Sequence, residues 1–424
     1  MKNRKSHFLV GAATAAHQVE GNNINSDCWA LEQASPSMFM EPSGAAVDHY
    51  SHYEEDIQLL AQAGLNAYRF SIEWARIEPE QGVWVQEEIE HYRKVLQCCR
   101  KNNIEPIVTL HHFSSPKWLI TLGGWENPQT ADLFAAYCER VVDELGGLMH
   151  YVCTINEANI GSQIAHMMSA SEEDRNNVAQ VGVSNPFADF QNVFAAAGAA
   201  LGCDPANLNI FLFPHSVQGE EIIMDAHKKA CAAIKAVCPE LKVGITLSLH
   251  DFQPVNGGEE RALREWEIEF SRYIPVIAQD DFLGVQCYTR TLIGPKGALP
   301  IPEGAECTQM GYEDYPMAIT HVVRKAASQF KGNILITENG IATSDDARRT
   351  EFIREATEGI RGCIEEGIPV KGYFYWSLLD NFEWMAGYGK TFGLIEVDRK
   401  TQRRFPKPSL QFLGALKWPE VRCS

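Results

Sequence analysis

The chain has 424 residues, of which 45% are hydrophobic and 22% are charged, and this composition excludes a disordered or fibrous protein. It carries 37 basic and 55 acidic residues, a formal net charge of −18, so its surface would repel the phosphates of nucleic acids and of anionic lipids. No apolar run approaches the roughly 20 residues that span a bilayer. We therefore expect neither a nucleic-acid partner nor a membrane partner.

The amino-terminal segment is basic and then apolar, which is also how a secretory signal peptide begins. Its apolar part is short and carries His17, Gln18 and Glu20, so we interpret it as part of the mature fold. The twelve cysteines are not a disulfide scaffold in so long a chain, and they lack the CxxC pairs of a zinc site. We expect reduced, buried thiols, a cytoplasmic location, and no metal or other cofactor.

Eight short β-rich runs recur along the chain, each followed by a helix-like stretch, at residues 8–14, 67–72, 105–112, 151–157, 242–250, 281–289, 333–340 and 370–378. Several are apolar on both faces, as strands of a parallel sheet covered by helices are. Eight strands in strict alternation with about eight helices predict an α/β fold, a (β/α)8 TIM barrel with extended βα loops, formed by residues 1–424 as a single catalytic domain. A doubly wound open sheet is the alternative, but no GxGxxG motif follows an early strand.

Helix signals stand between these runs. Ser51 precedes Glu54 by three residues, which predicts a capping box at the start of a helix. The segment 128–147 begins with proline and ends with two glycines, as a helix does. The stretch 159–241 is long enough for more than one helix, and we interpret it as an insertion within the barrel.

Residues at the carboxyl ends of the strands face the active site in a barrel of this type. These ends carry two acidic residues, Glu157 and Glu338, which lie far apart in sequence yet should converge on one rim. Two carboxyl groups among aromatic and amide side chains suit glycosidic bond cleavage, because one protonates the leaving oxygen and the other attacks the anomeric carbon or activates water. The same rim should carry Gln18, Arg69, His112, Asn156, Tyr288 and Trp376, with Glu383 and Trp384 in the loop beyond.

Each of these residues also has a structural explanation. Glu157 alone could cap a helix, and Glu338 precedes an Asn-Gly pair that favours a turn. His111 and His112 suggest a metal site, but adjacent strand residues point to opposite faces, so the two would hardly bind one ion. We assign His112 to the site and His111 to the core, and we expect Trp125 to be structural.

Ordered motifs run from "FLVGAATAAHQVEG" through "DHYSHYEEDI", "YRFSIEWARI", "TLHHF", "TINE" and "ITENG" to "GYFYWSLLDNFEW" and "KTFGLIEVD". Together they cover nearly the full chain, which resembles a β-glucosidase of glycoside hydrolase family 1. The resemblance implies a retaining mechanism, with Glu157 as general acid/base and Glu338 as nucleophile. Retention implies carboxyl groups roughly 5–5.5 Å apart and a covalent glycosyl-enzyme intermediate.

The resemblance also implies supporting roles. Arg69 and Tyr288 would keep Glu338 ionised, while Glu157 must stay protonated and needs a raised pKa. Asn156 would bind the 2-hydroxyl of the sugar. The remaining substrate contacts would be Gln18, His112, Trp376, Glu383, Trp384 and Phe392. The family also places a cis peptide bond after Trp376.

Glu383 limits the range of possible substrates. The 6-phosphoglycosidase branch of the family carries serine there, and a glutamate beside a phosphate is repulsive. We therefore expect a neutral, small-molecule β-glycoside. The alternatives are a 6-phospho-β-glycosidase, a transglycosylase, and a non-catalytic carbohydrate-binding protein on the same barrel. The aglycone, the choice among glucose, galactose and fucose, and the assembly of a homo-oligomer stay open.

Four residues depart from the family pattern. Ala158 stands where proline is usual, and Phe113 where tryptophan often follows the histidine. Gln286 and Cys287 stand where Asn-Tyr is usual. None of these changes removes a catalytic group, but they bear on fine specificity and on the shape of the site beyond the first sugar.

Overall fold

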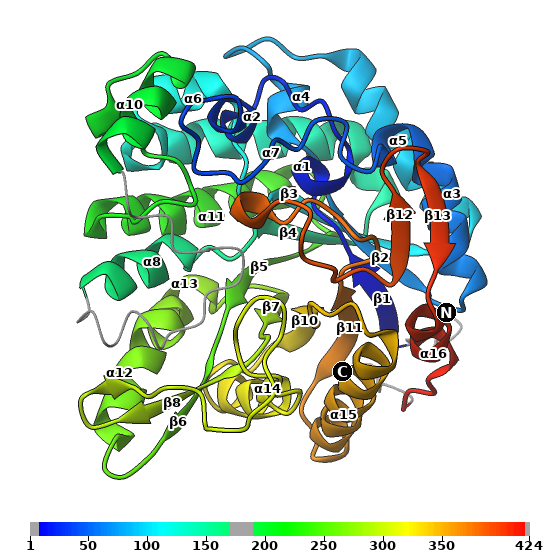
Figure 1. Cartoon of the computed structure of the whole chain (residues 1–424). Helices are drawn as coiled ribbons and strands as arrows, with labels where there is room; N and C mark the ends of the chain where they lie inside the picture. Colours follow the sequence, from blue (N-terminus) through cyan, green and yellow to red (C-terminus); the bar gives the residue numbers. More distant parts are fainter. Residues whose placement is uncertain (1–7, 170–189, 420–424) are drawn as a thin grey trace.

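Eight parallel strands close into a barrel in the computed structural model, which describes residues 8–169 and 190–419 (Figure 1). The strands are β1 (Leu9–Ala13), β2 (Ala67–Ser71), β3 (Glu105–His111), β4 (Tyr151–Ile155), β5 (Lys242–Ser248), β7 (Phe282–Gln286), β10 (Asn333–Asn339) and β11 (Val370–Trp376). The first strand pairs with β2 on one side and with β11 on the other, which closes the ring. Each strand lies within its predicted run, so the predicted barrel is confirmed.

The strands are apolar on both faces because alternate residues pack into two different clusters. Ala67, Ile107, Cys153 and Phe282 belong to a small cluster inside the barrel. Their chain neighbours, such as Tyr68, belong to the large cluster between the strands and the helices. Side chains alternate along a strand, so a strand covered on both sides needs apolar residues at nearly every position.

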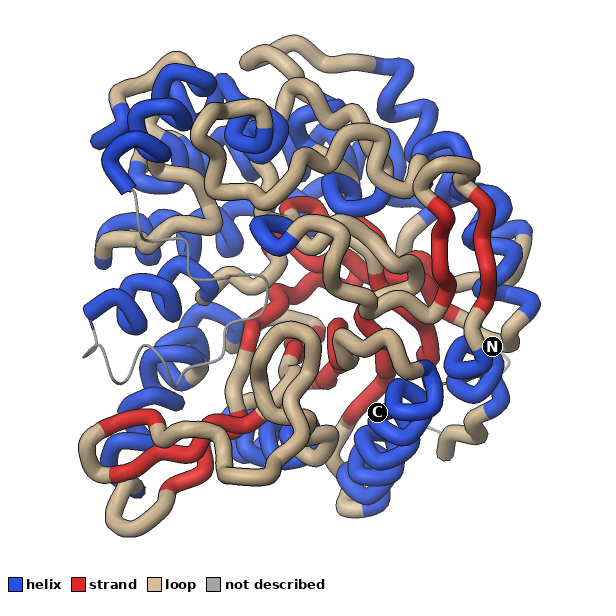
Figure 2. The backbone as a smooth tube through the Cα atoms, viewed as in Figure 1, coloured by secondary structure: helices blue, strands red, loops and turns tan. Residues whose placement is uncertain are grey.

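Helices surround the barrel, and Figure 2 shows them in blue around the red strands. In the described part of the chain they are α1 (Ala16–Val19), α2 (Asp27–Glu32), α3 (His49–Gln62), α4 (Trp74–Ile77), α5 (Gln86–Lys101), α6 (Lys117–Thr121), α7 (Thr130–Leu145), α8 (Ile160–Ser169), α10 (Phe190–Leu201), α11 (Val217–Val237), α12 (Glu259–Glu269), α13 (Ile274–Ile277), α14 (Ala318–Gln329), α15 (Asp346–Glu365) and α16 (Pro408–Ala415). None of them is long and apolar enough to cross a membrane.

The predicted strict alternation of strands and helices is wrong in detail. Two small sheets, outside the barrel, interrupt it: β6 (Asp251–Pro254), β8 (Arg290–Gly294) and β9 (Gly297–Ala298) form one, and β12 (Ile395–Asp398) pairs with β13 (Arg403–Pro406) in the other. Several loops also carry short extra helices. These elements are too short to give a periodic pattern that the sequence alone would reveal.

The predicted capping box at Ser51 is also wrong. The helix α3 begins two residues earlier, at His49, and Ser51 lies within its first turn. Its N-cap is Asp48, which has a left-handed backbone and makes no side-chain capping bond. The predicted helix over 128–147 corresponds to α7, and the stretch 159–241 contains α8, α10 and α11 as expected, with residues 170–189 outside the described part.

The eleven cysteines of the described residues are free thiols, and most of them are buried. Burial was expected, because an unpaired cysteine behaves as a small apolar residue. One of the partly buried thiols, Cys231, lies on α11, the 21-residue helix that packs against α7 and against the outer side of β4 and β5.

Candidate active site

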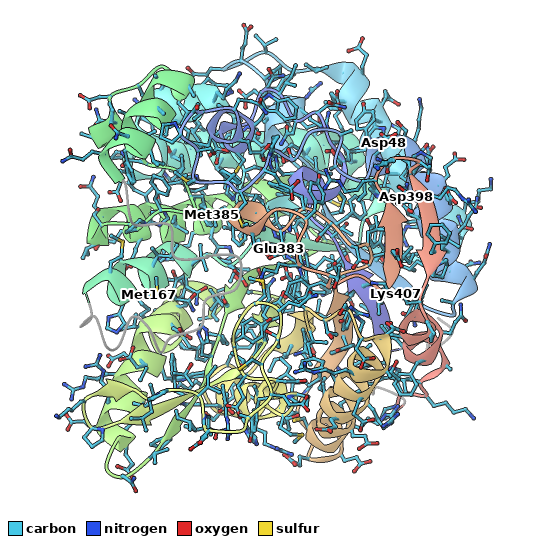
Figure 3. The ribbon with its side chains drawn as sticks, in the orientation of Figure 1. Asp48, Met167, Glu383, Met385, Asp398 and Lys407 are labelled. Carbon is cyan, nitrogen blue, oxygen red and sulfur yellow. The ribbon has the colours of Figure 1, made fainter. Side chains whose placement is uncertain are left out.

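The predicted site residues meet at the carboxyl ends of the barrel strands. They are Arg69 on β2, His112 after β3, Asn156 and Glu157 after β4, Tyr288 after β7, Glu338 on β10 and Trp376 at the end of β11. The loop that follows β11 carries Glu383, which lies in front of the barrel strands in the view of Figure 3. The side chains come from elements far apart in sequence, and the closed barrel brings them to one rim.

Three side chains contact the carboxylate of Glu338. Arg69 Nη1 lies 2.5 Å from Oε1, and the Tyr288 hydroxyl donates a 2.6 Å hydrogen bond to Oε2. Gln286 Nε2 donates a third bond to Oε1 at 3.0 Å. Burial raises the pKa of Glu338, and the Arg69 cation and the two hydrogen-bond donors counteract this. The contacts favour the ionised form, since an opposite charge and donors both stabilise a carboxylate.

Glu157 lies in a different environment. Its backbone has a positive φ of 44°, and its N–H donates to Thr246 Oγ1 at 3.0 Å. Burial and the nearby charge of Glu338 raise the pKa of Glu157 to about 8, against a hydrogen bond with Ser248 and the charges of Arg69 and His250. Two buried carboxyl groups that interact titrate as a pair. Because Glu338 holds the direct ion pair with Arg69, the single proton of the pair belongs on Glu157.

Asn156 connects the groups around the two glutamates. Its Oδ1 accepts hydrogen bonds from Arg69 Nη2 at 2.5 Å, from Gln286 Nε2 at 2.8 Å and from Thr246 Oγ1 at 3.1 Å. Its Nδ2 lies 3.2 Å from His112 Nε2. The amide is therefore fixed by its oxygen, which leaves its nitrogen directed toward the imidazole of His112.

Gln286 is a site residue that sequence reasoning missed. It was noted only as a departure from the family pattern, although it is the last residue of β7 and thus lies at the rim. Its Nε2 is within hydrogen-bond distance of Asn156 Oδ1 and Glu338 Oε1, both acceptors. Exchanging the amide oxygen and nitrogen would place an acceptor against both, so the observed orientation follows from the chemistry. The position at a strand end was the signal that could have found it.

A carboxyl group with a raised pKa also lies at Glu383. Burial and the charge of Glu338 raise its pKa to about 8, while hydrogen bonds with Gln18 and Trp376 and the charge of Lys390 lower it. Gln18 Nε2 donates to the Phe382 carbonyl oxygen at 2.6 Å, and its Oε1 is buried with no hydrogen-bond partner. An unsatisfied buried acceptor at this place can receive a hydroxyl group from a ligand.

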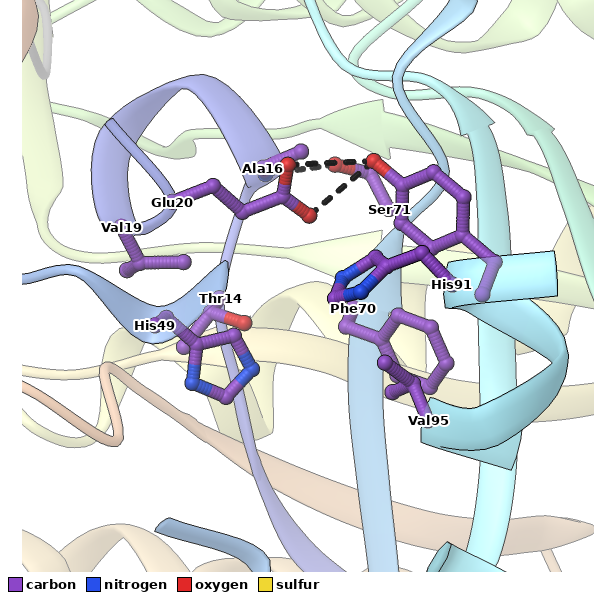
Figure 4. A pocket seen from close by; sticks show the side chains of 10 residues that line it. Thr14, Ala16, Val19, Glu20, His49, Phe70, Ser71, His91 and Val95 are labelled. Carbon is purple, nitrogen blue, oxygen red and sulfur yellow. Dashed lines mark hydrogen bonds between the residues drawn. The ribbon is translucent and has the colours of Figure 1, made fainter. Parts of the chain in front are cut away.

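The short helix α1 carries Gln18, and a buried network holds this helix in place. Glu20 accepts hydrogen bonds from the Tyr92 hydroxyl at 3.0 and 3.1 Å and from Arg76 Nε at 2.8 Å. Glu20 lines a small cavity of about 10 Å³, roughly the space of one water molecule. Figure 4 shows its carboxylate among the other lining side chains. The network ties α1 to helices α4 and α5, so Gln18 is presented from a rigid support.

Aromatic rings complete the site. The peptide bond between Trp376 and Ser377 is cis, as the resemblance implied. The ring of Trp376 stacks on His112 with centroids 5.7 Å apart, and Trp384 stacks on His17 at 5.6 Å. Phe392 is fully buried, and its ring meets Tyr288 edge-on, so it packs behind the Tyr288 side chain.

The two adjacent histidines have different surroundings, as the strand geometry predicted. His111 Nε2 lies 3.0 Å from Ser115 Oγ, and its ring contacts Trp125, which is fully buried. His112 instead contacts Asn156 and Trp376. Burial lowers the pKa of both imidazoles, so both are neutral at pH 7.

Glu157 and Glu338 are 6% and 4% exposed, so they interact in a medium that largely excludes water. Electrostatic interactions are stronger there than in bulk water. A carboxyl group with a raised pKa and one that contacts a cation and two hydrogen-bond donors thus lie at one rim, beside amides, an imidazole and two tryptophans. Such a set can donate a proton to a leaving oxygen and attack a carbon centre in the same pocket.

The sequence matches the model of Glycosyl hydrolase family 1 over residues 2–203 and 298–418. It is 30% identical to Beta-glucosidase A of Acetivibrio thermocellus, over 95% of each chain. Among solved structures, beta-glycosidase BGL167 superposes with a TM-score of 0.88 at 46% identity, over 96% of this chain and 95% of that one. A beta-glucosidase from Thermotoga maritima in complex with deoxynojirimycin has a TM-score of 0.78 at 27% identity, over 96% of each chain. The matched segments include Glu157 and Glu338 but exclude Gln286 and Tyr288.

Proposed function

We propose that this chain, which belongs to glycosyl hydrolase family 1 and is a glycoside hydrolase, acts as a retaining β-glucosidase. The two catalytic residues of the proposal are Glu338 and Glu157. The single observation that carries the assignment of roles is the contrast between the two carboxyl groups. Glu338 has a buried cation and two donors on it, whereas the pKa of Glu157 is raised to about 8. One is suited to attack and the other to give a proton.

The reaction has two steps. The carboxylate of Glu338 attacks the anomeric carbon, the bond to the aglycone oxygen breaks, and Glu157 gives its proton to that oxygen. The ionised Glu157 then takes a proton from a water molecule, whose oxygen attacks the same carbon and releases Glu338. This scheme requires carboxyl groups roughly 5–5.5 Å apart.

Arg69, Tyr288 and Asn156 are the supporting residues of the proposal. Arg69 and Tyr288 stabilise the negative charge that returns to Glu338 when the covalent bond breaks. Asn156 Oδ1 already accepts three hydrogen bonds, so Nδ2, which lies beside His112 Nε2, is the group left to donate to the sugar. A contact to the 2-hydroxyl strengthens in an oxocarbenium-like transition state.

We propose a neutral glucoside as the substrate, in line with the names of the relatives, several of which are beta-glucosidases. A carboxyl group with a pKa of about 8 is mostly protonated at pH 7, so Glu383 can both donate to and accept from sugar hydroxyls. A phosphate dianion at this place would be repelled by Glu383 whenever that carboxyl group is ionised. The substrate-binding set is Gln18, His112, Trp376, Glu383, Trp384 and, through Tyr288, Phe392.

A panel of p-nitrophenyl β-glycosides tests the proposal: the glucoside, galactoside, fucoside and glucoside-6-phosphate, each with the wild type and with Glu338→Gln. We expect turnover of the unphosphorylated glycosides that is lost in the variant. A preference for the phosphate would contradict the role of Glu383. Product analysis with an added alcohol separates hydrolysis from transglycosylation, and failure of every glycoside to react would favour a carbohydrate-binding protein.

A further inference from the structure

Three side chains with metal-ligating atoms meet away from the glutamates. His227 and Cys231 are one helical turn apart on α11, and Asp280 lies two residues before β7 begins. Their ligand atoms all lie within 4.8 Å of one another, and no other group of this kind occurs among residues 8–169 and 190–419. The cluster lies between α11 and the outer side of the barrel. The helix α11, which carries two of the three residues, is on the left of the view in Figure 1.

The surroundings of His227 allow two tautomers of its ring. Nδ1 lies 2.8 Å from the hydroxyl of Thr154, which is itself 3.5 Å from the Gly244 carbonyl oxygen. The hydroxyl hydrogen can go to that carbonyl oxygen, in which case Thr154 accepts a hydrogen bond from Nδ1–H, or to Nδ1, in which case the ring proton is on Nε2. Metal-binding histidines are held in the first way, by a hydrogen bond from the nitrogen that does not bind the metal.

The other nitrogen faces a carboxylate. Nε2 lies 3.2 Å from Asp280 Oδ1 and 3.1 Å from Oδ2, and this side chain is 5% exposed. Asp280 Oδ2 is buried and makes no hydrogen bond. A neutral ring protonated at Nδ1 presents a lone pair at Nε2, and a lone pair directed at a carboxylate is repulsive. In that tautomer a cation between the two groups, either a second ring proton or a metal ion, removes the repulsion, whereas in the other tautomer Nε2–H donates directly to Asp280.

We propose that His227 Nε2, Cys231 Sγ and the Asp280 carboxylate bind a zinc ion. Zinc bonds of about 2.0–2.3 Å in a tetrahedron set neighbouring ligand atoms roughly 3.3–3.8 Å apart. The Nε2–carboxylate distances of 3.1 and 3.2 Å are close to that spacing. Cys231 Sγ lies 3.7 Å from Nε2 and also 3.7 Å from Nδ1, so the thiol would have to turn toward Nε2 to complete the site. Thiolate and imidazole select zinc over magnesium or calcium, and the fourth position is left for water.

The charges of the cluster suit a dication. A thiolate and a carboxylate together carry two negative charges, which a divalent ion neutralises. Lys235, which lies four residues after Cys231 on α11, is already paired with Asp281 at 2.7 Å. A bound ion would join α11 to the segment before β7, on the outer side of the barrel. The proposal is therefore independent of the glycosidase assignment.

Zinc binding to the full-length protein tests this site. The protein is freed of metal with a chelator and titrated with Zn²⁺ by calorimetry, and with Co²⁺ to follow the absorption of a cobalt–thiolate bond. The variants are Cys231→Ser, His227→Gln and Thr154→Val. Cys238→Ser is the matched control, because Cys238 is a partly buried thiol at the end of the same helix but outside the cluster.

We expect one equivalent of zinc, a cobalt–thiolate absorption, and a higher melting temperature with zinc than without. Affinity should fall at least tenfold in Cys231→Ser and His227→Gln and roughly 10–100-fold in Thr154→Val, whose change affects only the orientation of the imidazole. Cys238→Ser should bind as the wild type does. The absence of stoichiometric binding to the wild type, which would leave a proton on His227 as the cation, would overturn the proposal. So would binding that is undiminished in Cys231→Ser.

Discussion

Arg69 on β2 and Glu338 on β10 form a buried ion pair across the barrel, with Nη1 2.5 Å from Oε1. The Arg69 side chain is fully buried and also donates to Asn156, so one guanidinium orients both a candidate nucleophile and a candidate sugar ligand. Burying a charged pair away from water costs free energy unless further hydrogen bonds are made to each of the two charged groups. At Glu338 that condition is met by Tyr288 and Gln286.

Replacement of Glu338 by glutamine should abolish turnover while the fold is kept. The amide is close in size but cannot form the covalent intermediate, so we expect a loss of roughly 10³-fold or more in kcat. Steady-state kinetics on the p-nitrophenyl glucoside measure it, with circular dichroism and the melting temperature as the control for folding. Appreciable residual activity in a well-folded variant would remove the nucleophile assignment.

Replacement of Glu157 by alanine should affect substrates unequally. Poor leaving groups need protonation in the first step, whereas activated aryl glycosides need little, so alkyl glucosides should lose the most activity. The measurement is kcat/KM over a series of glucosides with leaving groups of increasing pKa. Equal losses across the series would argue against a role as general acid.

The pH profile should fall on its alkaline side near pH 8. The general acid must carry its proton, and the pKa of Glu157 is raised to about 8, so kcat/KM should be maintained below that pH and be lost as the pH rises through it. The acidic side should report protonation of Glu338. In Glu157→Ala, measured with an activated aryl glucoside, the alkaline limb should disappear. Its persistence there would assign the limb to another group, such as Glu383.

Gln286→Met should shift the acidic limb of the same profile. The substitution removes the 3.0 Å hydrogen bond that Gln286 donates to the Glu338 carboxylate. The loss of this donor favours the protonated carboxyl group, so the pKa of Glu338 should rise. A bond to a charged group is worth about 1.5–3 kcal/mol, which corresponds to a loss of roughly 10–100-fold in kcat/KM.

Gln253→Met serves as the control for Gln286→Met, because Gln253 lies in the small sheet outside the barrel and makes no contact with either glutamate. Its profile should match that of the wild type. If the pH profile of Gln286→Met has the same limbs as that of the wild type, Gln286 does not affect the pKa of Glu338 and only packs in the site, even if kcat/KM falls.

The barrel strands could be predicted because burial on both faces leaves a long apolar signature, as in β2, all of whose five residues are buried. The rim rule then located Glu157, Glu338 and Arg69 without coordinates. The start of α3 could not be predicted, because Ser51 and Glu54 match a capping box while the helix begins at His49. Tertiary contacts decide such ends, and a local motif only suggests them.

The role of Gln286 depends on distances that no spacing in the chain contains. Its residue type and strand end were visible, but only the closed barrel brings its amide to Asn156 and Glu338. The same holds for the second cluster: His227 and Cys231 are four residues apart on one helix, whereas Asp280 comes from another part of the chain. Convergence of distant segments is the part of a site that sequence patterns leave undetermined.

Trapping of the covalent intermediate is the most direct test of the central claim. A 2-deoxy-2-fluoro-β-glucoside with a good leaving group destabilises both transition states, so the second step becomes slow enough for the glycosyl-enzyme to accumulate. Mass spectrometry should find one added glycosyl group per chain, on the peptide that contains Glu338. No added mass despite turnover of the ordinary glucoside, or a label on any other residue, would contradict the proposed mechanism.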